Sequence, residues 1–345
     1  MNYNIDKQYM VDMFERLVNI PSPVSYYDEI NPEMEKIAEE LAVPFEYDRK
    51  HTIYYVLDGE DNSKTVLVGA HLDTLGMVVR GINSDGTILT RNLGGLNFNS
   101  IEGTTVTIHT REGKKYTGLF VCKSHSTHVF DDARTMERNE NNMIVSLDEK
   151  VYSADDVRKL GIENGDIISF DPYFEYVNGY IKSRFIDDKA CVASVLGALK
   201  FIKDNNLKPK YRTLLAFPHF EEINHGGAYV PKEVEEYVAV DIGLIGPDNN
   251  GSEKTVSICC KDRHSPYDRG LTNILIEDAK KADCDYVVDV FYRYGTDANA
   301  AIMAGNNLYA AAFGMGCFSS HGRERTHIDG VYNTAKLVAS YILNA

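Results

Sequence analysis

The sequence predicts an α/β domain that is interrupted by a small, mostly β insertion. Apolar runs of strand length alternate with helical patterns near both ends of the chain. Between them, from about residue 78 to 171, short β-like runs alternate with glycine and polar turns. A chain of 345 residues is long enough for two domains. We therefore expect a main domain of residues 1–76 and 177–345 and an inserted domain of residues 77–176.

The first part of the main domain begins with a helix and continues with two strands. Apolar residues from Met10 to Val18 follow helical spacing, and this helix should end before Pro21 because proline disfavours helix in the residue before it. Strands are expected at 53–57 and 65–71. The second strand has the short, continuous apolar character of a strand buried inside a sheet.

The insertion and the second part of the main domain follow. Within the insertion we expect strands at 105–110, 118–121 and 167–170. After it, residues 192–202 mark one face of a helix, and a final helix covers about 334–343. The remaining strands of the main domain are expected at 213–217, 238–241, 256–260, 286–291 and 308–313.

Composition and charge exclude several classes of protein. Acidic residues number 51 against 36 basic ones, and a net charge of −15 repels nucleic-acid phosphates. No apolar run approaches the roughly 20 residues needed to span a bilayer, and the N-terminus lacks the features of a signal peptide. We therefore expect a cytoplasmic protein with no nucleic-acid or membrane partner. Its six scattered cysteines predict buried, reduced thiols.

Candidate chemical groups collect at the ends of predicted strands, where ligand sites lie in open α/β sheets. His71 ends a buried strand and has an acid, Asp73, two residues on, so it can be a metal ligand held by a second carboxylate. Asp187 and Asp188 stand just before a largely apolar helix, where a carboxylate is costly to bury without a cation. Taken alone, a structural histidine and a helix N-cap explain these two motifs as well or better.

The Glu221-Glu222 pair is the most specific motif. It follows a hydrophobic strand and precedes a glycine pair, so one glutamate can bind a metal while its neighbour faces water as a base. A solvated acidic loop is the alternative. Asp241 ends another apolar run, and His321 and His327 precede the last helix. Nitrogen and oxygen donors without thiolate suit Zn²⁺, Co²⁺ or Mn²⁺ rather than Ca²⁺, and two such ions could share one carboxylate, acidify water and polarise a carbonyl.

Several motifs, taken in their order along the chain, resemble one family. They are the Ile-Pro-Ser start, AHLDTLG, GIENGDIISFDP, FIDDKA, EEINHGGA, the VDIG acid, GTDANA and the Ser-His region before the last helix. Over most of its length the chain resembles the glutamyl-aminopeptidase family of dinuclear metallopeptidases, whose members build tetrahedral (TET) particles. The resemblance implies a mixed central sheet flanked by helices, two divalent ions per chain and peptide substrates. It also implies a homo-oligomer, such as a dodecameric tetrahedral particle, that the insertion helps to assemble.

The resemblance implies a role for each candidate residue. The metal ligands it implies are His71, Asp187, Glu222, Asp241 and His321. Asp187 would bridge the two ions, Glu221 would be the general base, and Asp73 would orient His71. Asp297 resembles a residue near the substrate's amino terminus. His327, which has an acid two residues on, stays open as the alternative to His321.

Three departures from the family's pattern bear on activity. Thr74 stands where many relatives carry glutamate, and Ile223-Asn224-His225 replaces the usual valine-glycine pair. The final motif is Ser-His-Gly-Arg-Glu-Arg-Thr-His, where relatives have His-Ser followed by a later acid. This last departure is the reason why both C-terminal histidines remain candidates.

An aminopeptidase is the leading interpretation of the sequence. Carboxypeptidases, dipeptidases and N-acyl amino acid deacylases share this metal chemistry, and a non-catalytic self-assembling particle could keep the same fold. A serine hydrolase is disfavoured because no GxSxG elbow appears, and Cys191 as a nucleophile is disfavoured by its predicted burial. Arg323 and Arg325 could pair with an acidic substrate side chain, although solvated arginines explain them more simply.

Overall fold

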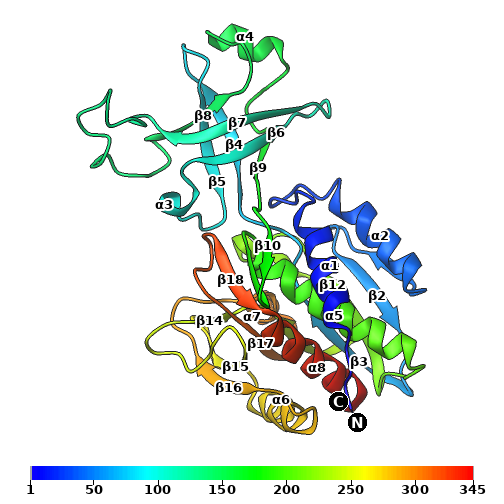
Figure 1. The fold of residues 1–345 in the computed structure, drawn as a ribbon. Helices are drawn as coiled ribbons and strands as arrows, with labels where there is room; N and C mark the ends of the chain where they lie inside the picture. The colour runs from blue at the N-terminus through cyan, green and yellow to red at the C-terminus, as the bar shows by residue number, and fades with distance from the viewer. Residues whose placement is uncertain (1, 345) are drawn as a thin grey trace.

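A computed structural model describes residues 2–344 of the chain, and its main domain is built around one mixed sheet (Figure 1). The strands of this sheet are β1 (Phe45–Tyr47), β2 (Ile53–Leu57), β3 (Asp61–Gly69), β12 (Tyr211–Phe217), β13 (Val234–Val240), β14 (Gly243–Leu244), β15 (Val256–Lys261), β16 (Tyr286–Val290) and β17 (Tyr309–Cys317). Their order is β1-β2-β12-β3-β13-β17-β15-β16, with β14 pairing β17. Neighbours from β12 to β17 pair in parallel, whereas β2 and β15 pair antiparallel with β12 and β17.

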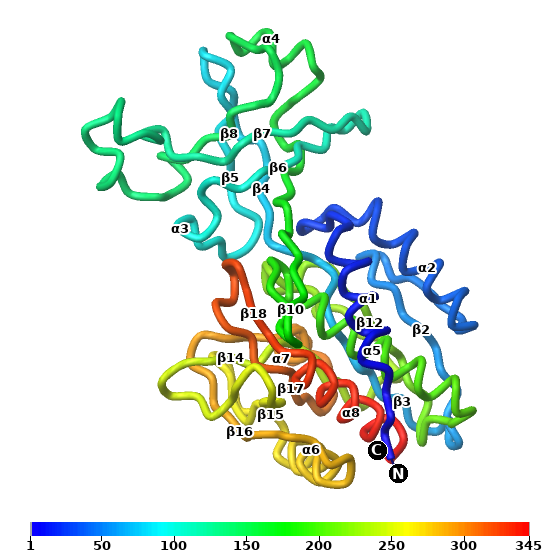
Figure 2. The backbone as a smooth tube through the Cα atoms, viewed as in Figure 1, coloured from blue at the N-terminus to red at the C-terminus, as the bar shows by residue number. Residues whose placement is uncertain are grey.

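Helices cover both faces of the sheet, which confirms the predicted fold class (Figures 1 and 2). One face carries α1 (Lys7–Val18), α2 (Ile30–Glu40), α5 (Ile186–Asp204), α6 (Arg269–Lys281) and α8 (Ile328–Asn344), and the other carries α7 (Asp297–Met303). Successive residues of a strand face opposite sides, so Val66 and Val68 of β3 join the larger core while Leu67 joins the smaller one. The sheet is therefore buried on both faces.

The insertion forms a closed barrel that lies apart from the sheet (Figure 1). Its elements are β4 (Gly76–Ile82), β5 (Ile88–Leu93), α3 (Phe98–Ile101), β6 (Thr104–His109), β7 (Lys115–Cys122), β8 (Met143–Leu147), α4 (Ala154–Lys159) and β9 (Ile167–Phe170). The barrel has an apolar core of its own, which includes Val106, Phe120 and Ile168. Below it, β10 (Glu175–Val177), β11 (Tyr180–Ser183) and β18 (Glu324–His327) form a small antiparallel sheet. The proposed domain boundaries at 76 and 177 stay a prediction.

Most expected elements are present, with shifted ends. β2 and β9 have the expected ranges, but β3 ends at Gly69, so His71 lies in the loop that follows it. The helix expected at 192–202 begins at Ile186, so its acidic pair lies in the first turn. The sequence patterns missed α2, α6 and α7. In α7 the apolar positions are mostly alanines, which give a weak periodic signal.

The cysteines and the helices bear on two of the compositional expectations. All six cysteines are free, and Cys122, Cys191, Cys259 and Cys317 are buried. Within residues 2–344, none of the helices combines the length and the apolar character that crossing a membrane requires.

Candidate active site

The loop that follows β3 carries His71 and Asp73, and its shape is held by the Pro-Ser segment near the start of the chain. The Ser22 hydroxyl donates to the Leu72 carbonyl (2.7 Å), and the Thr74 amide donates to the Ser22 carbonyl (2.9 Å). The Nδ1 atom of His71 lies 2.9 Å from the Asp73 carbonyl oxygen. With Nδ1–H donating to that carbonyl, the lone pair of His71 is on Nε2 and available to a metal ion.

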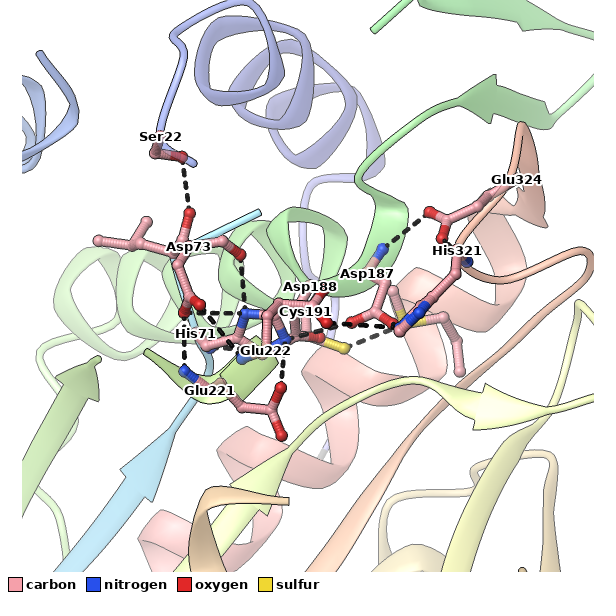
Figure 3. A network of polar contacts seen from close by, with 12 residues as sticks. Ser22, His71, Asp73, Asp187, Asp188, Cys191, Glu221, Glu222, His321 and Glu324 are labelled. Atoms are coloured by element: carbon pink, nitrogen blue, oxygen red, sulfur yellow. Dashed lines mark hydrogen bonds and ion pairs between the residues drawn. The ribbon is translucent and has the colours of Figure 1, made fainter. Parts of the chain in front are cut away.

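Asp73 joins this loop to the glutamate pair. Its carboxylate is fully buried and accepts hydrogen bonds from the amides of Glu221 (3.1 Å) and Glu222 (3.2 Å). The two glutamates begin a short 3-10 turn, Glu221–Ile223, in the segment that follows β12. Figure 3 shows His71 and the glutamate pair grouped around Asp73. Asp73 therefore sets the position of three candidate residues at once.

Asp187 lies between the two histidines at the start of α5 (Figure 3). One carboxylate oxygen is 3.1 Å from His71 Nε2, and the other is 3.5 Å from His321 Nε2. The peptide bond that joins Asp187 to Asp188 is cis. The carboxylate of the next residue, Asp188, accepts a hydrogen bond from the His71 amide (3.0 Å) and belongs to neither group of candidate metal ligands.

Two groups of side chains have the geometry to hold a metal ion. His71, Asp187 and Asp241 form one buried group, and Asp187, Glu222 and His321 form a second, partly exposed group. Within each group, the donor atoms lie within 4.8 Å of one another. Asp187 belongs to both groups, as a bridging ligand would.

Glu221 lies beside the two groups and belongs to neither. Its Oε2 atom is 3.7 Å from His71 Nε2, and its side chain is 14% exposed. The carboxylate is therefore close to the metal-binding groups and keeps some contact with solvent. The structure thus separates the two adjacent glutamates, with Glu222 turned toward His321 (3.5 Å) instead.

Carboxylates outnumber basic side chains among the residues of the two groups and Glu221. Burial raises the pKa of Glu221 and of Asp241 well above the usual range, and it raises the pKa of Glu222 to about 7. Although burial alone would lower the pKa of His321, the neighbouring carboxylates of Glu222 and Asp187 raise it to about 11. This donor set fits divalent cations, which supply the positive charge that several buried carboxylates demand.

Of the two remaining candidate residues, Asp297 lies close to the site and His327 does not. His327 lies on β18, where its Nδ1 accepts the Asp329 amide (3.1 Å) and its ring packs on Tyr180, so it is not brought to either group. Asp297 is brought close to the site, and it lines a small cavity together with His71, Glu221 and Asp241.

A cleft with a volume of about 950 Å³ opens onto both groups. Its lining includes the acidic residues described above and four basic residues that the sequence patterns did not indicate, here called the basic wall: Lys261, Arg263, His264 and Arg293. Arg323 and Arg325 are not part of it, since they pair with Glu175 and Glu253 respectively. Lys261 is the last residue of β15, Arg263 and His264 follow that strand, and Arg293 follows β16, so their position at strand ends was the signal that could have found them.

A second feature missed from the sequence is Glu324. Its buried carboxylate accepts hydrogen bonds from the backbone amides of Asp187 (3.0 Å) and His321 (2.9 Å), so it holds the backbones of these two residues together (Figure 3). Only the fold brings together these three residues, because Glu324 lies 137 positions from Asp187.

The fold and the donor set define a class of metal-dependent hydrolases, and comparison with known proteins specifies the family. Residues 52–337 match the M42 glutamyl aminopeptidase family. YhfE of Bacillus subtilis, a protein named as an aminopeptidase, is 39% identical over 334 residues, which are 96% of each chain. The chain therefore belongs to the M42 glutamyl aminopeptidase family, and it is a metal-dependent aminopeptidase.

Solved structures show the same fold at low sequence identity. The TET aminopeptidase from the archaeon Thaumarchaeota archaeon SCGC AB-539-E09 has a TM-score of 0.88 and 18% identity, covering 98% of this chain and 96% of that one. The Pyrococcus horikoshii TET1 peptidase, which can assemble into a tetrahedron or a large octahedral shell, has a TM-score of 0.84 and 20% identity, covering 97% and 100%. Both likenesses include the barrel as well as the main domain.

Proposed function

We propose that the chain removes N-terminal residues from peptides with two divalent cations, Zn²⁺ or Co²⁺ first and Mn²⁺ as a third choice. The observation that carries this proposal is the pair of three-donor groups that share Asp187. His71 and Asp241 would hold one ion with Asp187, and Glu222 and His321 would hold the other. When bound, such ions polarise the scissile carbonyl and lower the pKa of water.

Glu221 acts as the general base. Its carboxylate faces the two groups without belonging to either, so it can take a proton from water and later give that proton to the leaving amine nitrogen. Asp73 contributes indirectly, since it positions the Glu221 amide and the His71 imidazole.

Asp297 is the candidate for recognition of a free amino terminus. Its Oδ1 atom accepts the Gly227 amide (2.6 Å), whereas its buried Oδ2 atom has no hydrogen-bond partner among residues 2–344. A protonated or hydrogen-bonding α-amine of the substrate would satisfy that oxygen. This interpretation favours an aminopeptidase over a carboxypeptidase or an N-acyl amino acid deacylase, whose substrates offer no such amine at the scissile end.

The basic wall of the cleft indicates an acidic first residue in the substrate. Arg263 and Arg293 line the cleft on a protein of net charge −15, and neither forms an ion pair with a carboxylate of the described chain. Free guanidinium groups bind carboxylates with directed hydrogen bonds. The name of the M42 family points to the same substrate class.

An assembled particle is the proposed form of the enzyme. The P. horikoshii TET1 peptidase shares the whole fold and forms closed shells, and we propose a homo-oligomer on that ground, with the barrel as a contact region. Light scattering on the purified chain measures its mass directly. A monomeric mass at working concentration would contradict this part of the proposal.

Metal content and substrate choice test the proposed activity. We expect two ions per chain, loss of activity on chelation and its return on adding metal. Free N-terminal peptides should be cut and N-acetylated ones should not. Among aminoacyl anilides, glutamyl and aspartyl substrates should be preferred to leucyl ones.

A matched pair of variants tests the basic wall. Arg263→Met should raise KM for glutamyl anilide and leave KM for leucyl anilide unchanged, whereas the control Arg323→Met, whose arginine pairs with Glu175 outside the cleft, should change neither. Equal activity on free and acetylated peptides would contradict the aminopeptidase. No preference for acidic residues would remove the role of the basic wall only.

A further inference from the structure

The barrel reaches back to the active site through one tight turn after β5. This turn, Gly94–Leu96, is closed by a hydrogen bond from the Leu96 amide to the Gly94 carbonyl (3.2 Å). The carbonyl oxygen of Gly95 lies 2.9 Å from Nδ1 of His321. A histidine of the main domain therefore has one ring nitrogen bonded to the inserted domain.

This contact fixes how the His321 ring can act. A carbonyl oxygen only accepts, so Nδ1 carries a proton, and Nε2 is the nitrogen left to coordinate a metal ion. Nε2 then faces the carboxylates of Asp187 and Glu222, at 3.5 Å from each. The main domain holds the His321 backbone through Glu324, but the hydrogen bond to Gly95 is the one that orients the ring.

The turn fits the site closely because it lacks side chains. Gly94 has φ +83°, and a Cβ atom there would lie 2.4 Å from a methyl group of Leu75 and 3.3 Å from Cβ of Glu222. A Cβ atom on Gly95 would lie 3.2 Å from Nδ1 of His321. Both glycines thus allow the backbone of the barrel to approach two residues of the second metal-binding group.

A second contact ties the barrel to the same side of the site. Arg184 lies just before Asp187 and is 5% exposed, and its guanidinium donates to the Ser100 carbonyl (3.0 Å) and the Thr104 hydroxyl (2.7 Å) of the barrel. Ser100 also lies against the residue after His321, because a Cβ atom on Gly322 would be 3.2 Å from its hydroxyl. The barrel is therefore anchored beside both residues that face Glu222.

We propose that the Gly94–Leu96 turn of the barrel is a positioning element for the group formed by Asp187, Glu222 and His321. The proposal rests on the proposed metal-binding function of this group. The inserted domain thereby completes one of the two metal sites, in addition to any part in assembly. The other group, with His71 and Asp241, has no such contact with the turn and should bind its ion independently of it.

Two variants and a matched control test the proposal. Gly95→Ala places a methyl group against the His321 ring without a positive φ, and Gly94→Ala adds a strained φ and a clash with Leu75. Gly113→Ala is the control, since Gly113 is also a barrel glycine of positive φ (+79°) but a Cβ atom there meets nothing within 4 Å. Each purified, metal-free enzyme is titrated with Zn²⁺ by calorimetry, and its melting temperature is measured without metal.

The expected result is selective loss of one ion. Gly95→Ala should bind one Zn²⁺ as wild type does and the second about 10–100-fold more weakly, the usual cost of disturbing an outer partner of a metal ligand. Excess Zn²⁺ should restore kcat, and the metal-free melting temperature should match that of wild type. Gly113→Ala should bind both ions normally.

Other outcomes would contradict either the positioning role of the turn or the proposed function with two metal ions. If Gly95→Ala and Gly94→Ala bind two ions with wild-type affinity, the turn has no positioning role. If either variant loses both ions together, the turn does not act on one group selectively. If wild type itself binds fewer than two ions, the proposed function fails instead, and the two failures are thus distinguished.

Discussion

The candidate active site has two halves that share Asp187: the His71 half, with Asp241, and the His321 half, with Glu222. The histidines of the two halves make the same kind of hydrogen bond, but their partners come from different parts of the chain. In both, a histidine has Nδ1 next to a backbone carbonyl oxygen at 2.9 Å, which leaves Nε2 for a metal ion. For His71 that carbonyl belongs to Asp73, two residues on, whereas for His321 it belongs to Gly95, 226 residues away in the barrel. The His71 side chain is 2% exposed and the His321 side chain is 36% exposed.

The carbonyl that contacts His71 therefore comes from the same loop, whereas the carbonyl that contacts His321 comes from the other domain. The His71 half is fixed by the buried loop after β3, by the buried carboxylate of Asp73 and by the parallel strands on either side of β3. The His321 half depends on the barrel being docked correctly, so small movements of the barrel change its donor geometry. We therefore expect the His321 half to lose its ion first under chelation, and we expect variants to affect the two halves unequally.

The largest effect is expected at the residue that both halves share. Asp187→Asn removes a charged oxygen from each metal-binding group while keeping the shape of the side chain, so both ions should be lost and activity should fall to background. Metal content per chain after gel filtration measures this directly. His327→Ala is the control and should retain both ions, because its ring packs on Tyr180 away from the site. If Asp187→Asn kept two ions, Asp187 would not be the shared ligand.

The next effect is expected beside the His71 half, at Glu221. Glu221→Gln removes the proposed base but neither metal-binding group, so kcat should fall about 10²–10⁴-fold with both ions retained. Steady-state rates and metal content on the same sample check this expectation. Unchanged kcat would remove Glu221 as the base, and loss of an ion would make it a ligand instead.

The sequence predicted the His71 half of the site better than the His321 half, for a physical reason. His71, Asp187 and the glutamate pair each follow a strand or begin a helix, and parallel strands bring such positions to one edge of the sheet. The sequence favoured His321 as the last ligand but left His327 open as the alternative, because both histidines stand near the last helix. What separates them in the structure is the path of the loop before β18 and the position of the barrel, which local patterns do not record.

The same reasoning explains the features that were missed. The Gly95 carbonyl, the Glu324 carboxylate and the basic wall with Arg263 act across long sequence separations. A backbone carbonyl has no signature in a sequence. The fold class and most strands could be predicted, since burial on both faces of a sheet leaves continuous apolar runs.

A smaller effect is expected at Asp73, which supports the His71 half. Its two carboxylate oxygens accept amides from both glutamates, and the asparagine of Asp73→Asn can accept through only one oxygen. We expect activity or metal affinity to fall about 10–100-fold, as for other outer partners of metal ligands. Kinetics and calorimetry together measure the two quantities. Unchanged values of both would show that the carboxylate is dispensable for orientation.

The smallest effect concerns the packing of the barrel on the main domain. His109 of β6 packs on Tyr26, lies 2.8 Å from the Ser169 hydroxyl, and also faces Glu29, which pairs with Lys115. Burial lowers the pKa of His109 from 6.5 to about 4. Because the folded state binds this proton less readily than the unfolded state, stability from neutral His109 is present above about pH 6.5 and is lost as the pH falls toward 4.

His109→Gln tests this pH dependence. The free energy of unfolding of the wild type should fall more steeply between about pH 6.5 and 4 than that of the variant. The exposed His128→Gln serves as the control and should follow the wild type. Parallel curves for wild type and His109→Gln would exclude this histidine as the source of the difference.

In the proposed enzyme, two metal sites share Asp187, and His321, not His327, completes the second site. Anomalous diffraction from crystals of the zinc-loaded enzyme tests it most directly. We predict two zinc peaks per chain, one between His71 and Asp241 and one between Glu222 and His321, with Asp187 adjacent to both. A single peak, or a peak at His327, would contradict this account.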